Sequence, residues 1–152
     1  MNIITRLALG LAGWAIALGA HAAPQAALGQ TLSATEIQQL GVLPEFRAGP
    51  DHYRLLPQKT EDGQGSLLLD ERGAVVASHH EVMITQAAED QVRAALRQGP
   101  SPSIVQHFAP TGITVVRYDD FAQTIAGLKA LQTGLPDATV RLSIVQSRKK
   151  PY

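Results

Sequence analysis

Hydrophobic positions between residues 74 and 99 change from the alternation of a strand to the wider spacing of a helix. Three of them, in the segment 74–85, fall on one side of an extended chain and predict a strand: Val76, Val82 and Ile84. The next apolar residues recur at three- and four-residue steps, which predicts a helix with one buried stripe: Ala88, Val92, Ala95 and Leu96. Gly99 and Pro100 stand where such a helix would end.

The same change of period recurs further along the chain. Two strand-like runs, 104–109 and 113–118, are joined by Pro110-Thr111-Gly112, which predicts a hairpin. Asp119 or Asp120 supplies the N-cap of a second helix, whose apolar stripe is Phe121, Ile125, Leu128 and Leu131. The helix is expected to close at Gly134 and Pro136, and a last alternating strand follows over 140–144.

These elements run strand, helix, strand, strand, helix, strand, which is the order of the split βαβ, or ferredoxin-like, fold. Two right-handed crossovers would interleave the strands in one antiparallel sheet with both helices on one face. The other face would stay open to solvent or to a partner. The alternative is a helix-covered meander with an unassigned strand order.

A shorter pattern precedes this core. Ser33 to Glu36 has the spacing of a capping box and predicts a small helix that ends at Gly41. Turn-forming residues 48–51 separate two short strands, and the polar segment 59–65 is an expected loop. We expect Leu67–Leu69 and 74–85 to pair as one long hairpin around Asp70–Gly73. The predicted class is therefore α+β, with an extension over 23–65, a core over 66–146 and a tail over 147–152; whether the extension covers the open face is undecided.

The first 22 residues have the organisation of a signal peptide. Arg6 gives the start of the chain a positive charge, an uncharged apolar run follows over 7–20, and Ala20-His21-Ala22 is a small-x-small cleavage pattern. The run is shorter than the roughly 20 residues that span a bilayer as a helix. The sequence predicts export to the periplasm or beyond the cell after cleavage near Ala22, without membrane insertion of the mature chain.

Composition narrows the classes of function. Cleavage of residues 1–22 removes Arg6 and leaves 12 of the 13 basic residues against 13 acidic ones. The mature chain therefore has no positive electrostatic field that would attract nucleic acid or anionic lipid. Cysteine is absent, which excludes disulfides, cysteine ligands for zinc and a cysteine nucleophile. No cofactor is implied by any motif.

Candidate chemistry is sparse. His79-His80-Glu81 is the one local cluster in the sequence that suggests metal or acid–base chemistry, and on a continuous strand His79 and Glu81 would share a side. A tetrahedral site would need a further ligand such as His52 or His107, which the spacing does not bring close, so a polar strand face is the favoured interpretation. No Gly-x-Ser-x-Gly elbow is present, and we expect no enzyme activity.

The C-terminal tail is the more unusual feature. Arg148, Lys149 and Lys150 follow the last predicted strand and precede Pro151 and Tyr152. One interpretation is a solvated tail that prevents edge pairing, and the other is an extended recognition peptide that contacts a partner.

A split βαβ domain followed by an extended tail resembles the propeptides of subtilisin-like serine proteases and their stand-alone inhibitors and chaperones. The resemblance covers about 74–152 and rests on element order. It implies an open sheet face packed on the protease and a tail in its substrate cleft. In the kexin-like branch, which cuts after paired basic residues, Lys150 would precede a scissile bond to Pro151, which is a poor substrate because proline lacks an N–H.

The resemblance implies an exported, non-enzymatic chaperone or inhibitor of a secreted subtilisin-like or kexin-like serine protease, with Arg148–Tyr152 as its binding tail. The extension over 23–65 departs from the simple propeptide pattern. Two alternatives are open: an immunity or accessory protein for another periplasmic partner, and a metal-binding protein that uses His79 and Glu81.

Overall fold

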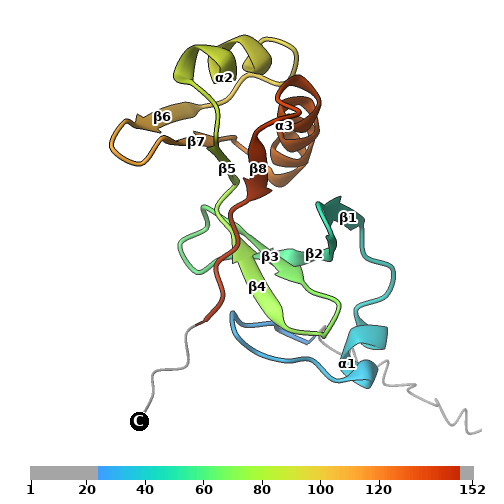
Figure 1. Ribbon diagram of the computed structural model, residues 1–152. Helices are drawn as coiled ribbons and strands as arrows, with labels where there is room; N and C mark the ends of the chain where they lie inside the picture. Colours follow the sequence, from blue (N-terminus) through green and yellow to red (C-terminus); the bar gives the residue numbers. More distant parts are fainter. Residues whose placement is uncertain (1–23, 148–152) are drawn as a thin grey trace, which may run out of the picture.

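The computed structural model describes residues 24–147, which fold into two four-stranded antiparallel sheets and three helices (Figure 1). The first sheet has the order β1-β2-β3-β4, and the second has the order β6-β7-β5-β8. The predicted α+β class is confirmed. No helix within residues 24–147 is long and apolar enough to cross a membrane.

The first sheet is a meander that carries the short helix α1 at one end (Figure 1). Its elements are α1 (Ala34–Gln39), β1 (Glu45–Ala48), β2 (Asp51–Lys59), β3 (Ser66–Leu69) and β4 (Val75–Ser78). The predicted capping box is confirmed, because the Ser33 hydroxyl accepts from the Glu36 N–H while the Glu36 carboxylate accepts from the Ser33 N–H. The predicted turn at Gly73 is confirmed by its φ of +80°, which glycine adopts without strain.

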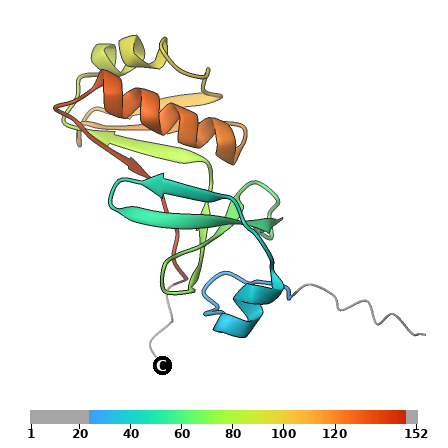
Figure 2. The same cartoon turned by 90° about the vertical axis from the view of Figure 1, so that its right-hand side faces the viewer.

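The second sheet carries both longer helices on one face. Its elements are β5 (Glu81–Thr85), α2 (Glu89–Leu96), β6 (Ile104–Phe108), β7 (Ile113–Arg117), α3 (Phe121–Gly134) and β8 (Thr139–Leu142). Figure 2 shows α3 in front of the sheet with α2 above it, and the β1–β2 hairpin next to β8. Asp120 is the N-cap of α3, since its carboxylate accepts from the Gln123 N–H at 2.8 Å.

The prediction of a single strand over 74–85 is wrong. Residues 75–78 form β4 in the first sheet and residues 81–85 form β5 in the second, with a break at His80, whose φ is +63°. The sheets therefore divide at His79-His80, and residues 66–78 pair with β2 instead of opening the second sheet. The hydrophobic pattern concealed this break because Val76, Val82 and Ile84 all enter one core that both sheets share.

Two chain segments that lie side by side connect the two sheets. The first is the passage from β4 to β5, and the second is the return segment 143–147 after β8. The Ser143 N–H donates to the Glu81 carbonyl at 2.9 Å, and Val145 exchanges two backbone hydrogen bonds with Ala77 at 2.8 and 2.9 Å. Phe46 of β1 also meets Phe121 of α3 edge to face, with ring centroids 5.0 Å apart. The sheets thus pack as one body.

Candidate functional site

The candidate site is the face of the second sheet that the helices leave uncovered. Side chains alternate along each strand, so Val82 and Ile84 enter the core while Met83 between them points to the other side. The register places Val115 between Met83 and Gln106, Ile113 beside Phe108, and the charged Arg141 of β8 on the other side of Met83. We call this surface the open face, defined by Met83, Ile104, Gln106, Phe108, Ile113 and Val115.

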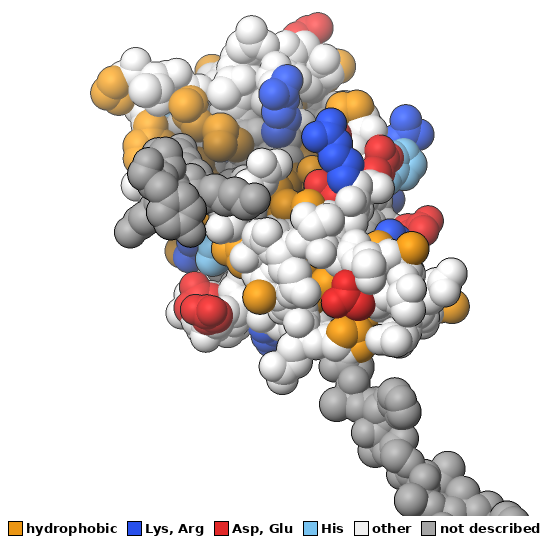
Figure 3. Space-filling model, turned by 90° about the horizontal axis from the view of Figure 1, so that it is seen from below, with side chains coloured by type: hydrophobic (Ala, Val, Ile, Leu, Met, Phe, Trp, Pro, Cys, Tyr) orange, Lys and Arg blue, Asp and Glu red, His pale blue; other side chains and the backbone are white. Residues whose placement is uncertain are grey.

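The open face is unusually apolar for a surface in contact with water. Met83, Ile104 and Phe108 expose 39%, 50% and 41% of their surface, and they are three of the six large hydrophobic residues that are exposed within residues 24–147. In Figure 3 hydrophobic side chains gather on the left, the side on which Figure 1 places the β6–β7 hairpin. Exposed apolar side chains gathered on one face of a sheet are typical of interaction sites.

A charged border closes one end of the open face. The Glu81 carboxylate accepts hydrogen bonds from two guanidinium nitrogens of Arg117, from Nε at 3.1 Å and from Nη2 at a shorter distance. Both side chains are partly exposed. Asp62 and Gln64, from the loop between β2 and β3, line the same depression. The pKa of Asp62 is lowered, first by a hydrogen bond from the Thr60 hydroxyl and then by the Gln64 N–H. The extension therefore borders the open face at this end and leaves its apolar centre exposed.

The His79-His80-Glu81 cluster does not form a common site. His79 lies between β4 and β5, so the expectation that His79 and Glu81 share one strand is wrong. The His79 Nδ1 stands 4.0 Å from an Asp62 carboxylate oxygen, the His80 Nε2 meets the Ser66 hydroxyl at 2.9 Å, and Glu81 pairs with Arg117.

The other two histidines proposed as further ligands are held elsewhere. His107 hydrogen-bonds the Thr114 hydroxyl at 2.9 Å, and His52 pairs with Arg47 in the first sheet. Within residues 24–147, no group of three or more His, Cys, Asp or Glu side chains is placed to hold a metal ion.

His80 makes the stability of the fold depend on pH. Burial lowers the pKa of this imidazole, and the charge of Asp120 opposes the effect only in part; His79, Lys59 and Arg117 add to the lowering. The unfolded chain therefore binds a proton on His80 more readily than the folded chain does. The contribution of neutral His80 to stability is complete above about pH 6.5, the pKa of histidine in the unfolded chain. It is lost as the pH falls through the folded pKa.

We expect the free energy of unfolding to fall below pH 6.5 with a slope of at most about 1.4 kcal/mol per pH unit from this group. Urea unfolding at pH 7.5, 6 and 5 measures it. The variant His80→Asn should flatten the slope, because Asn also tolerates the positive φ of this position. His52→Asn, at an exposed position of the first sheet that does not act on His80, is the matched control and should keep the wild-type slope. An unchanged slope in His80→Asn would contradict the assignment.

The proposed tail, Arg148–Tyr152, and the signal peptide, residues 1–22, lie outside the described residues. The structure does describe the residues that lead into the tail, up to Ser147. Ser147 lies against Gly29, where an added Cβ would clash with the Ser147 side chain. Since Val145 is already paired with β4, the tail begins beside the first sheet instead of directly at the end of β8.

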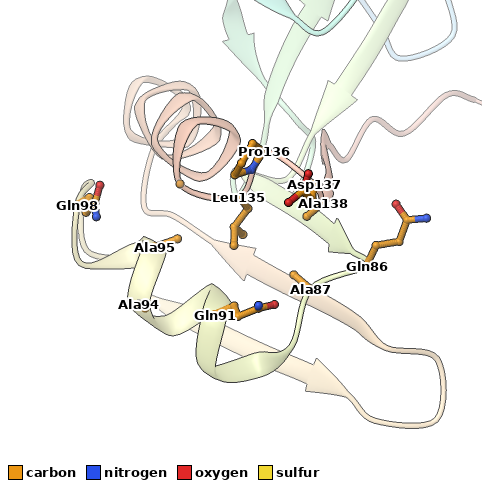
Figure 4. Close-up of a pocket in the computed structure, with 11 residues that line it drawn as sticks. Gln86, Ala87, Gln91, Ala94, Ala95, Gln98, Leu135, Pro136, Asp137 and Ala138 are labelled. Carbon is orange, nitrogen blue, oxygen red and sulfur yellow. The ribbon is translucent and has the colours of Figure 1, made fainter.

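A hollow of about 380 Å³ lies between α2 and the turn that joins α3 to β8, which the sequence did not predict. Figure 4 shows Leu135 pointing toward α2 and Gln86 pointing away from the hollow. Among its lining residues Asp137 is the only ionisable one, and the side-chain oxygen of Gln91, Oε1, already accepts from the Ala88 N–H. Since no second acid, base or nucleophile faces Asp137, the hollow offers no catalytic pair.

No protein-family description matches the sequence, and searches of curated proteins and of solved structures find no match.

Proposed function

We propose that this chain is an exported, non-enzymatic binding protein that chaperones or inhibits a secreted subtilisin-like serine protease. The open face docks on the protease, and the tail Arg148–Tyr152 enters the substrate cleft. The observation that carries the proposal is the exposed apolar centre of the open face, with Met83, Ile104 and Phe108 on one side of a sheet whose other side is covered by helices.

The strand order supports the proposal. The sequence β5-α2-β6-β7-α3-β8 folded in the order β6-β7-β5-β8 is what two crossovers of a split βαβ unit produce, which favours a ferredoxin-like assignment for this half of the chain. A propeptide of the resembled family presents the same kind of uncovered sheet face to its protease. The Glu81–Arg117 pair at the border is suited to fix the orientation of docking.

The position of Ser147 limits where the cleft can lie. Five extended residues reach at most roughly 18 Å, so the tail can enter only a cleft within that distance of the first sheet. A partner that holds both the open face and the tail must therefore extend along the molecule from the second sheet to the first. Pro151 after Lys150 makes the bound tail resistant to cutting.

Removal of the tail tests its role. A chain that ends at Ser147 should inhibit the co-exported protease at least about tenfold less strongly than the full chain, since it lacks the part that occupies the cleft. It should still bind through the open face. Inhibition is measured by titration with a chromogenic peptide substrate, and binding is measured by calorimetry. Unchanged inhibition would remove the tail from the mechanism.

The pairing of Val145 with β4 favours a second candidate, in which the tail is not engaged. The open face would then serve an immunity or accessory protein that recognises another exported protein. Capture from the exported fraction separates the two candidates, because the identity of the captured protein decides between a serine protease and a different partner.

A further inference from the structure

The two sheets have four outer edges, and three of them are protected. The β4 edge is covered at Val75, which donates to the Gln30 carbonyl and accepts from the Gly29 N–H, and again at Ala77 by Val145. The β1 edge carries Glu45 and Arg47. Charged side chains and covering segments are the usual means by which proteins prevent unwanted pairing of strand edges.

The β8 edge is protected in both ways. It carries Arg141, and the β1–β2 hairpin faces it across a shared hollow lined by Tyr53 and Leu142 (Figure 2). The Val140 carbonyl also accepts from the Gln132 side chain at 3.4 Å.

The β6 edge has none of these protections. β6 is the terminal strand of its sheet, and no segment within residues 24–147 pairs with its outer side. Its five residues, Ile104–Phe108, include neither proline nor a charged side chain. The absence of charge extends over the whole segment 98–116, between Arg97 and Arg117. Such an edge is a template for another strand.

We propose that a second copy of this chain pairs with the β6 edge, so that the two β6 strands run antiparallel with Gln106 opposite Gln106. In this register Ile104 of each copy faces Phe108 of the other, which covers two exposed apolar side chains on each molecule. Val105 then faces His107 on the helix side of the sheet.

The chemistry of the segment favours a second copy over a charged peptide. A charged partner would meet no countercharge on 98–116, whereas the same neutral segment brings an apolar residue against each exposed apolar residue. Because residues two apart share a face, the register centred on Gln106 keeps the helices of both copies on one side. The product is an eight-stranded sheet whose two open faces form one continuous surface. The inference rests on the edge and not on the proposed function.

Charge substitutions at the centre of this register test it. In Gln106→Lys or Gln106→Glu, two like charges would stand directly opposite each other, so each variant alone should dimerise at least tenfold more weakly than the wild type. An equimolar mixture of the two variants should recover the dimer as a heterodimer. Sedimentation equilibrium of the purified protein over a range of concentrations measures the association. The matched controls Gln39→Lys and Gln39→Glu, on the exposed surface of α1, should associate like the wild type.

Circular dichroism establishes that each variant is folded. A wild-type chain that stays monomeric up to millimolar concentration would overturn the proposal. So would single-charge variants that dimerise as strongly as the wild type, or a mixture that does not recover the dimer. Loss of association in the Gln39 variants would place the interface elsewhere and would also overturn it. None of these outcomes depends on protease binding.

Discussion

The Gly127→Ala variant is expected to be less stable than the wild type by about 1–3 kcal/mol, although alanine is the better helix former. Gly127 lies in α3 against the ring of Tyr118, which is 2% exposed. An added Cβ would meet the Cζ and Oη atoms of Tyr118 at distances far below van der Waals contact. Because the ring is enclosed by the core, it has no free space into which to move. Urea unfolding measures the difference.

The neighbouring position supplies the matched control. Ala126 is exposed on the same helix, so Ala126→Gly should cost only the roughly 1 kcal/mol of lost helix propensity. In the double variant Gly127→Ala with Tyr118→Leu, the smaller side chain relieves the clash, and the two effects should be less than additive. If Gly127→Ala were more stable than the wild type, α3 would not pack on Tyr118 as described.

Local chemistry explains what the sequence could predict of this fold. The capping residues Ser33 and Asp120 and the turn at Gly73 act on backbone groups within four residues of themselves, so their signals are complete in a short window. The helix α3 was predictable for the same reason, since its buried stripe and its N-cap are contained in one segment.

Features that depend on distant segments could not be predicted. His80 adopts a left-handed conformation without being glycine, so the sequence carries no mark of the break between the sheets. The pairing of Val145 with Ala77 joins segments 68 residues apart, 145 minus 77, and fixes where the tail begins. The open face itself was expected from topology, but its apolar centre appears only when the register sets Met83 beside Val115.

The second large effect concerns Met83 at the centre of the open face. Met83→Asp should weaken binding to the proposed serine protease partner at least about 30-fold, the ratio that corresponds to roughly 2 kcal/mol for a central interface residue. The cause is the loss of an apolar contact at the centre of the interface together with the removal of water from a new carboxylate, a cost that its neighbour Arg141 on β8 offsets only in part. Folding should be preserved, because Met83 is 39% exposed and its side chain does not enter the core.

Leu28 provides a matched control for this substitution. It is 41% exposed, close to the value for Met83, and it precedes the first sheet, outside the strands that form the open face. The Leu28→Asp variant adds the same charge at a comparably exposed apolar position. It should therefore bind the protease with wild-type affinity.

The dissociation constant of the protease complex, measured by calorimetry for the wild type, Met83→Asp and Leu28→Asp, tests the central claim most directly. The claim that the open face is the docking surface predicts nanomolar to micromolar binding by the wild type and by Leu28→Asp, and a loss of about 30-fold or more in Met83→Asp. Equal affinity of all three proteins, or no binding by the folded wild type, would contradict it.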